Sequence, residues 1–575
     1  MSSPQTGWGQ EVRRGADWIG RRSRALVPRS ADYRAMRIAP QRDLIAGITV
    51  GVVALPLALA FGITSGLGAA AGLITAVVAG TVAAVFGGSN VQVSGPTGAM
   101  TVVLVPIVAQ YGANGVLVVG LLAGLLLIVM ALAGLGRYVR FIPLPVIEGF
   151  TLGIAVIIAL QQVPAALGVQ ASGEQVLLVA TSAVGDWLAA PDWLTVGIAA
   201  GVAGLMIVAT RLRIKPAIPV ALIAVVAATI AAEVADLDVA TIGALPSSFP
   251  APSLPAFTTG DLRVLMAPAV AVAALAALES LLSATVADAM SVSQRHDPDR
   301  ELLGQGLANV ASPLFGGIPA TAAIARTAVN VRTGAVSRLA AIVHSAVLLV
   351  VVLALGAVVG LIPLAALAGV LIATAVRMVE VSSLRALLRS GRGDSLVLAV
   401  TFVATVVLDL ATAVILGIIA AGGLALRQVA GSATLTETPL ETLGESSDTH
   451  TAEERELLDE HIVAFRFEGP LFFGGAHAAL LELAEVSDIR VVILRLSHVT
   501  TLDATGAAVL SDTIRSLENR GITVLLSGLP EQFTARLEAT GILQHLSDQN
   551  HVFGHTPDAI GHARRHVSRD GHHLG

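Results

Sequence analysis

Two short runs that interrupt long apolar sequence constrain the fold of this chain more than any other feature. They are Ser94–Ala99 and Gly317–Ala323, and each contains a proline, Pro96 or Pro319. We expect each proline to be the first residue of a helix, because that position needs no backbone hydrogen bond. The free N–H groups of such a helix, together with its dipole, favour an anion in front of it. One such break in each half of a membrane protein is typical of inverted-repeat transporters, so we expect the two half-helices to face an anion.

The composition supports a membrane protein and excludes several classes of chemistry. The 575 residues are 54% hydrophobic and 13% charged, with a mean hydropathy of +0.79, which predicts several spanning segments. The chain has no cysteine, which excludes disulfides, thiol catalysis and cysteine-ligated metals. The soluble region offers no pair of nucleophile and base, no metal-ligand spacing and no phosphate loop, so we do not expect an enzyme.

Apolar runs of spanning or half-spanning length predict about fourteen membrane segments. The runs at 97–111 and 320–331 are shorter than a full crossing. The runs begin near residues 44, 69, 97, 115, 146, 193 and 217 in the first half, and near 264, 302, 320, 336, 364, 395 and 411 in the second.

The distribution of charge predicts the topology. The arm 1–43 is rich in arginine, and arginines also follow in alternate loops, for example Arg137, Arg211 and Arg338. The predicted outer stretches 168–192 and 232–263 are acidic instead. We therefore expect a multi-pass protein of the cytoplasmic membrane, with both termini cytoplasmic and no nucleic-acid partner.

The chain divides into five predicted segments. The basic N-terminal arm, 1–43, precedes a transmembrane domain, 44–430, and an acidic linker, 431–460. A small α/β domain follows at 461–555, and a tail at 556–575 carries His562, His566, His572 and His573. We expect the tail to be disordered, with any metal binding adventitious. Within the small domain, strands are predicted at 461–467, 490–496 and 522–527, and helices at 475–486, 504–520 and 530–540.

Glu279 is the single charged residue in the apolar run Val264–Ala287. A carboxylate inside a spanning helix is costly and indicates function, and its cost falls when it carries a proton, which suits proton coupling. Ser283 lies one turn further on the same face and can share a water or a cation with it. The alternative is a structural carboxylate held by a fixed partner.

Three polar residues accompany the two breaks. Arg326 follows Pro319 by seven residues, about two helical turns, where its charge can attract an anion or pair with Glu279. Thr97 and Thr321 lie just beyond the two prolines. Their hydroxyls can cap free N–H groups, donate to a bound anion, or bond to their own backbone.

These residues resemble the sulfate permease (SulP) family of anion transporters, the group that includes prestin and pendrin. The likeness extends over about residues 40–550, and Leu502–Gly506 resembles the loop of the STAS domain with which such transporters end. The matching motifs of the membrane region are Leu55–Phe61, Gln92–Gly98, Pro143–Phe150, Ala277–Ser283, Gly304–Asn309 and Gly316–Asn330.

The resemblance implies seven-plus-seven inverted repeats, divided into a core and a gate domain, in a homodimer that works by an elevator-like movement. It implies an anion bound between the third and tenth helices, and a STAS domain that supports assembly or binds a cytoplasmic partner. The carry-over assigns Thr97, Gly98 and Ala99 to one side of the anion, Ala322, Ala323 and Arg326 to the other, and Phe61 to the pocket wall.

Departures from the family pattern bear on the substrate. Leu57 stands where many sulfate carriers have glutamine, and Ile324 stands where sodium-coupled bicarbonate members have a hydroxyl, whose loss weakens a sodium site. Those members also have aspartate where Glu279 stands, and glutamate there resembles proton-coupled bacterial carriers of dicarboxylates. We expect a proton-coupled symporter of a small inorganic or carboxylate anion, of the C4-dicarboxylate, bicarbonate or sulfate class, without a cofactor. The alternatives are sodium-coupled bicarbonate or sulfate transport, a passive anion channel, and a non-transporting sensor that signals through the STAS domain.

In the STAS-like loop, Ala504 directly follows Asp503, where phosphorylated relatives carry serine. Phosphorylation at that position is therefore excluded. Thr505 is a weak candidate, and its ordinary role is to cap the following helix.

Overall fold

The computed structural model describes residues 26–171, 175–212, 218–246, 248–257, 259–291, 295–408, 410–430, 434–437, 461–472 and 489–571. The chain separates into two compact units, Met1–Ile418 and Ile419–Gly575. The predicted helix at 475–486 lies outside the described residues, as do the arginines of the arm before residue 26.

The first unit is helical, and its helices follow the apolar runs of the sequence. Among the described residues, 8 helices are long and apolar enough to cross a membrane, and three shorter apolar helices accompany them. The first half contains α3 (Pro40–Thr64), α4 (Ala69–Phe86), α5 (Gly98–Ala133), α6 (Leu144–Gln161), α7 (Val163–Leu167), α8 (Val176–Ala189), α9 (Trp193–Arg211) and α10 (Val220–Val234). The second half contains α11 (Thr259–Met290), α12 (Pro298–Leu314), α13 (Ile324–Arg332), α14 (Leu339–Ala354), α15 (Gly356–Gly360), α16 (Leu364–Met378), α17 (Val381–Ser390) and α18 (Arg392–Val407), and α19 (Leu410–Ala430) crosses the boundary between the two units.

In the first half, one feature agrees with the predicted apolar runs and one does not. Gly112 interrupts α5 with a φ of 69° and a ψ of −177°, so the helix is two segments end to end, as the separate runs beginning near 97 and 115 predict. The stretch 168–192, expected as an outer loop, contains the helix α8. The expectation of a loop rested on acidic residues such as Asp186 and Asp192. It is wrong because the apolar residues in the middle of this stretch form a helix.

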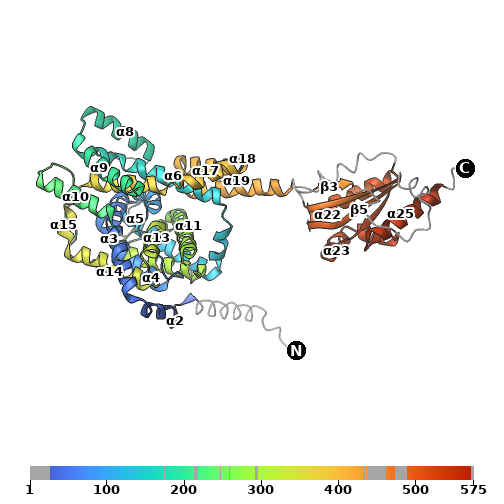
Figure 1. The fold of residues 1–575 in the computed structure, drawn as a ribbon, viewed down its shortest axis with the longest axis horizontal. Helices are drawn as coiled ribbons and strands as arrows, with labels where there is room; N and C mark the ends of the chain where they lie inside the picture. The colour runs from blue at the N-terminus through green and yellow to red at the C-terminus, as the bar shows by residue number, and fades with distance from the viewer. Residues whose placement is uncertain are drawn as a thin grey trace. The chain divides into compact units, whose positions relative to one another are not determined.

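The helices form two groups, and each group draws on both halves of the chain. In one group α3, α4 and α5 pack against α11, α12, α13 and α14, and Figure 1 shows α3, α5, α11 and α13 side by side. In the other group α6 packs against α18, and α9 packs against α16. This division agrees with the core and gate domains that the sequence motifs imply.

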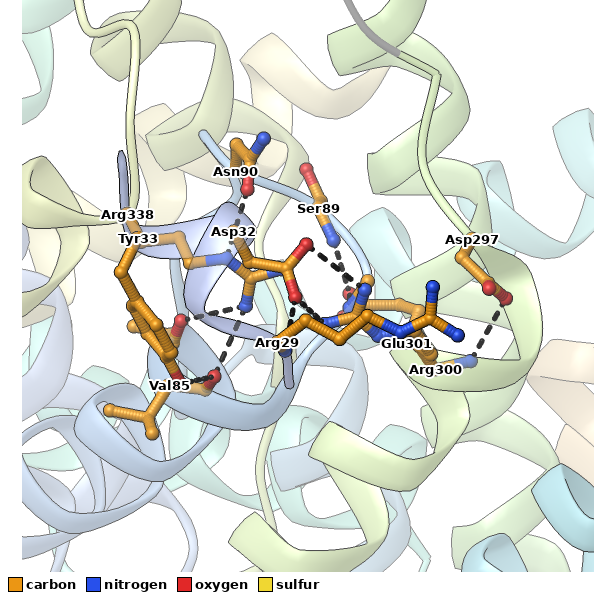
Figure 2. Close-up of polar contacts among 12 residues, drawn as sticks. Arg29, Asp32, Tyr33, Val85, Ser89, Asn90, Asp297, Arg300, Glu301 and Arg338 are labelled. Carbon is orange, nitrogen blue, oxygen red and sulfur yellow. Dashed lines mark hydrogen bonds and ion pairs between the residues drawn. The ribbon is translucent and has the colours of Figure 1, made fainter. Parts of the chain in front are cut away.

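A buried polar cluster fastens the short helix α2 (Ser30–Arg34) to one end of the first group (Figure 2). Asp32 forms an ion pair of 2.9 Å with Arg300 on α12, and the Tyr33 hydroxyl donates to the carbonyl of Val85 at 3.0 Å. Burial raises the pKa of Asp32, but the hydrogen bonds from Arg300 and from the backbone of Arg29 outweigh it and hold that pKa below its ordinary value.

Arg338, expected as a loop cation, is only 2% exposed and belongs to the same cluster. Its guanidinium donates to the side chain of Asn90 at 2.9 Å and to the carbonyls of Ala84 and Val85. Those carbonyls lie at the end of α4, where a helix leaves acceptors without partners. Arg338 therefore caps a neighbouring helix, a role that the charge pattern alone did not indicate.

The second unit contains a five-stranded sheet of order β3-β4-β5-β6-β7, in which β3 is antiparallel to β4 and the other pairs are parallel. Helices cover both faces, as parallel strands require. On one face Val492 and Leu494 pack with α22, α23 and α24, and on the other Val491 and Ile493 pack with α25. The elements are β3 (Thr434–Glu437), β4 (Ile462–Leu471), β5 (Val491–Leu502), α22 (Ala504–Asn519), β6 (Thr523–Ser527), α23 (Glu531–Glu538), α24 (Ile542–Asp548), β7 (Val552–Phe553) and α25 (Thr556–Gly571).

Two predicted segments of this unit need correction. The tail 556–575 was expected to be disordered, but Thr556–Gly571 forms α25, which buries Ala559, Ile560, Ala563 and Val567 against the sheet. Histidines and arginines between these residues hid the stripe in the sequence. Within the expected linker 431–460, β3 extends the sheet, and the rest of that segment lies outside the described residues.

Candidate functional site

The two breaks meet in the middle of the first helix group as a short antiparallel ladder. Ser94–Gly95 forms β1 and Thr321–Ala322 forms β2, with Ser94 opposite Ala322 and Gly95 opposite Thr321. This pairing satisfies the backbone of the two extended segments, which lipid and apolar side chains cannot do. The sequence predicted two extended segments but not that they pair with each other.

The helices that follow begin later than the prolines. The N-cap of α5 is Thr97, one residue after Pro96, and the N-cap of α13 is Ala323, four residues after Pro319. The prediction that each proline opens a helix is therefore wrong by two residues in the first half and five in the second. Arg326 consequently lies in the first turn of α13 and not two turns along a half-helix.

Glu279 of α11 joins the two breaks. Its Oε2 atom accepts hydrogen bonds from the hydroxyls of Thr97, at 2.9 Å, and Thr321, at 2.5 Å. The Thr97 hydroxyl also accepts a long bond from the backbone N–H of Met100, at 3.4 Å, which completes the cap of α5. One carboxylate oxygen therefore controls the orientation of both threonine hydroxyls.

Arg326, on α13, contacts the residue before Thr97. Its side chain is 2% exposed, and its Nη2 donates to the carbonyl of Pro96. Its Nη1 has no hydrogen-bond partner among the described residues. A Cβ atom on Gly95 would lie 2.7 Å from that Nη1, and Gly95 has a φ of 154°. The guanidinium thus needs glycine at this position, and its Nη1 is a buried donor without a hydrogen-bond partner.

The described residues contain no ion pair within 4.0 Å between Glu279 and Arg326. Glu279 accepts from the side-chain hydroxyl of Thr97, whereas Arg326 donates to the backbone carbonyl of the preceding residue, Pro96. The geometry therefore does not support a direct structural pair, which was the alternative to an anion site.

The remaining wall of the site lies where the two helix groups meet. A Cβ on Gly98 would lie 3.2 Å from the ring of Phe61 on α3 and 2.3 Å from Cδ1 of Ile158 on α6. Phe61 and Ala99 are buried, at 5% and 2% exposure. Gly98 therefore lies in direct contact with the second helix group, and Ile158 is a contact residue that sequence reasoning did not identify.

The second half supplies fewer free donors than expected. The N–H of Ala322 donates to the Ser280 hydroxyl at 3.1 Å, and the N–H of Ala323 donates to the carbonyl of Val93 at 3.0 Å. These two groups are already bonded in this conformation. The first turn of α13 still presents N–H groups that lack intrahelical partners, beginning at Ile324, whose side chain is 40% exposed.

The Ser283 hydroxyl bonds to a different residue than Glu279. It is fully buried, and its hydroxyl donates to the Thr327 hydroxyl on α13 at 3.2 Å. Thr327 in turn accepts from the N–H of Val93 at 3.1 Å. This chain ties α11 to α13 and to the segment before β1.

Buried amides hold the breaks in place from behind. Asn309 of α12 bonds both backbone groups of Ala320, donating to its carbonyl at 2.9 Å and accepting from its N–H at 2.8 Å. Gln305 donates to the Ser94 hydroxyl at 2.7 Å, and Gln92 donates to the carbonyl of Ser280 at 2.8 Å. Gln305 and Asn309 belong to the Gly304–Asn309 motif, so the signal was in the sequence, but their partners were not.

Comparisons with known proteins agree with this architecture. A family model described as the sulfate permease family matches residues 41–401, and one described as the STAS domain matches residues 457–559. The putative sulfate transporter YvdB of Bacillus subtilis is 36% identical over 538 residues, which cover 91% of this chain and 97% of that protein. The bicarbonate transporter BicA of Picosynechococcus is 31% identical over 522 residues, which cover 86% of this chain and 90% of that protein.

Solved structures show the same fold. The transmembrane domain of a cyanobacterial bicarbonate transporter, BicA, aligns with a TM-score of 0.61 at 32% identity, covering 66% of this chain and 98% of that domain. Murine Slc26a9, an anion transporter solved in an inward-facing state, aligns with a TM-score of 0.78 over 98% of this chain and 96% of that one. Its 17% identity supports the fold alone.

Proposed function

Because the chain belongs to the sulfate permease family, we propose that it is a secondary active transporter of small anions, which bind between the N-termini of α5 and α13. The observation that carries this proposal is the convergence of two helix N-termini, the free Nη1 of Arg326 and a carboxylate within one hydrogen-bonded unit. Helix N-termini and a buried guanidinium each favour a negative ligand, and together they supply both charge and directed donors.

Glu279 is the coupling group in this proposal. When it is ionised it offsets the charge of Arg326 and holds both threonine hydroxyls, Thr97 and Thr321. A proton on Glu279 leaves the positive charge of Arg326 uncompensated, and the two hydroxyls become free to donate to an anion. Proton binding therefore raises anion affinity, and by thermodynamic reciprocity anion binding favours the proton, which is the basis of symport.

The substrate is a small anion of the dicarboxylate, bicarbonate or sulfate class, and the coupling ion is the proton. The names of the relatives, sulfate and bicarbonate transporters, support a small oxyanion. Sodium coupling is the alternative, but Ile324 contributes no oxygen ligand at the start of α13. We further propose that the protein is a homodimer of the cytoplasmic membrane with both termini cytoplasmic, and that its STAS domain binds a cytoplasmic partner.

Uptake into proteoliposomes tests the proposal. The purified protein is reconstituted, and uptake of labelled fumarate, bicarbonate and sulfate is measured with and without an inward proton gradient, and separately with a sodium gradient. Accumulation above equilibrium with the proton gradient alone supports proton symport, and accumulation with sodium alone supports the alternative. Equilibration that no gradient can drive uphill indicates a channel, and no uptake of any anion favours a sensor that signals through the STAS domain.

A further inference from the structure

Three histidines of the second unit face one another at the edge of the sheet. The ring centroids of His551, His562 and His566 lie 5.6, 5.7 and 5.8 Å apart, so the rings form a nearly equilateral triangle. One ligand nitrogen from each ring lies within 4.8 Å of the other two. This cluster belongs to the STAS domain and is unrelated to the proposed anion site.

The fold itself builds this arrangement. His562 and His566 are separated by one turn of α25 and share one face of the helix, while His551 directly precedes β7. The contact of α25 with β5, β6 and β7 brings that face to His551. Because Ala559, Ile560, Ala563 and Val567 lie buried beneath α25, the histidines keep their positions relative to the sheet.

His551 has an unsatisfied polar atom that points to a ligand. Its side chain is 7% exposed, and its Nδ1 has no hydrogen-bond partner among the described residues. A buried polar atom without a partner costs free energy, so native structures seldom retain one without a reason. A metal ion that this nitrogen ligated would supply the missing partner.

We propose that His551, His562 and His566 bind one divalent transition metal ion of the zinc class, with water as the fourth ligand. Tetrahedral coordination at about 2.0 Å places ligand nitrogens about 3.3 Å apart. The ligand nitrogens now lie within 4.8 Å of one another, so binding would draw the three rings closer together. Neutral imidazole suits zinc, copper and nickel, whereas magnesium and calcium prefer oxygen ligands, which restricts the class of ion.

Such an ion would join the start of β7 to the C-terminal helix. The Phe553 ring lies 5.2 Å from the His562 ring and forms an apolar wall beside the cluster, which limits solvent access to the ligands. Since α25 packs on one face of the sheet, against β5, β6 and β7, the ion would hold α25 in place on that face.

The test uses the full-length protein without a polyhistidine tag, in detergent and stripped with a chelator. Zn²⁺ binding is measured by calorimetry, and Co²⁺ is added as a spectroscopic probe of tetrahedral coordination. We expect one ion per chain, the visible absorption of tetrahedral Co²⁺, and slower hydrogen exchange in α25 when zinc is bound. Loss of one ligand in His566→Gln or His562→Gln should weaken Zn²⁺ binding by about 100-fold.

Two control variants separate this cluster from other histidines. His498→Gln changes an exposed histidine of the same domain that lies outside the triangle, and it should leave binding unchanged. The double variant His572→Gln/His573→Gln removes the histidines at the end of the chain and should also bind one ion. Binding that survives His566→Gln and His562→Gln, or that disappears in the double variant, would overturn the proposal, as would a wild-type protein that binds no Zn²⁺. His566 is only partly buried, so its replacement is compatible with folding, which thermal unfolding of the variant checks.

Discussion

The hydroxyl oxygens of Thr97 and Thr321 lie 3.2 Å apart, although 224 positions separate them in the chain. Thr97 follows β1 by two residues and Thr321 is the first residue of β2, and both hydroxyls donate to the same oxygen of Glu279. Neither threonine could be assigned this role from one half of the sequence alone, because the partner comes from the other half. In the proposed function Glu279 binds the proton and Arg326 binds the anion, so the two roles can be tested separately.

Glu279→Gln should abolish proton-driven accumulation while leaving anion exchange measurable. The amide resembles the protonated carboxyl in shape and charge, so the site stays competent for an anion but no longer responds to pH. Proton-driven uptake and counterflow exchange of the anion are both measured between pH 5 and 8, and the two rates are compared. Glu148→Gln is the matched control, because Glu148 is a carboxylate on α6 that accepts from Ser383 and lies outside the site. Unchanged accumulation in Glu279→Gln would remove Glu279 from the coupling role.

Arg326→Ala should weaken the binding of every anion by about 30- to 150-fold, since a hydrogen bond to a charged group contributes about 2–3 kcal/mol. Arg326→Lys retains the charge but not the fork that reaches Pro96, so we expect an intermediate affinity. Binding is measured by scintillation proximity or calorimetry on protein that passes a size-exclusion and thermal-unfolding check. An unaltered affinity in Arg326→Ala sinks its assignment as an anion ligand.

Gly98→Ala should reduce transport, because the added methyl group would lie 2.3 Å from Cδ1 of Ile158. The clash falls between the two helix groups, so it should slow turnover more than it weakens binding. Ile158→Val removes Cδ1, and the double variant Gly98→Ala/Ile158→Val should recover much of the lost rate. Gly201→Ala on α9 is the control, since its added methyl group meets nothing within 4 Å. A double variant no faster than Gly98→Ala contradicts the steric explanation.

Asp32→Asn should destabilise the protein near neutral pH by up to about 1 kcal/mol, through the loss of its ion pair with Arg300. The folded pKa of Asp32 is lowered, so its stabilising contribution is present above the unfolded value of about 3.9 and is lost as the pH falls through the folded value. The difference in stability between wild type and variant should therefore shrink below about pH 4. Thermal unfolding in detergent across pH 3–7 measures it, and a constant difference over that range argues against the ion pair.

Periodicity and hydropathy predicted much of this architecture, because each spanning helix corresponds to one apolar run in the sequence. The same local signals placed the interruption near Gly112 and the strands β4, β5 and β6 of the small domain, but not β3 or β7. They misplaced the start of α13, because Pro319 is a local signal, whereas Ala320–Ala322 pair with distant residues. Helix α25 was missed for a related reason, since its narrow stripe of small apolar residues has meaning only against the face of a sheet.

The sequence singled out the residues of the candidate site but not the hydrogen bonds between them, and their role in anion binding stays a prediction. Glu279, Thr97, Thr321 and Arg326 do lie around one point, and the hydrogen bonds among them required coordinates. Ile158 carries no chemical group that a sequence search would select, and its role depends on a glycine in another helix. Shape complementarity between distant segments leaves no local pattern in a single sequence.

The ladder of β1 and β2 has a mechanical consequence. The ladder joins the N-terminus of α5 to that of α13, and Glu279 adds a second connection by accepting hydrogen bonds from the hydroxyls of Thr97 and Thr321. A motion that drew the two N-termini apart would have to break the backbone hydrogen bonds of the ladder in the protein interior, where they are costly to lose whatever the protonation state of Glu279. We therefore expect the N-termini of α5 and α13 to move together as one unit, and access to the proposed binding site from either side of the membrane to depend on movement of other helices around that unit.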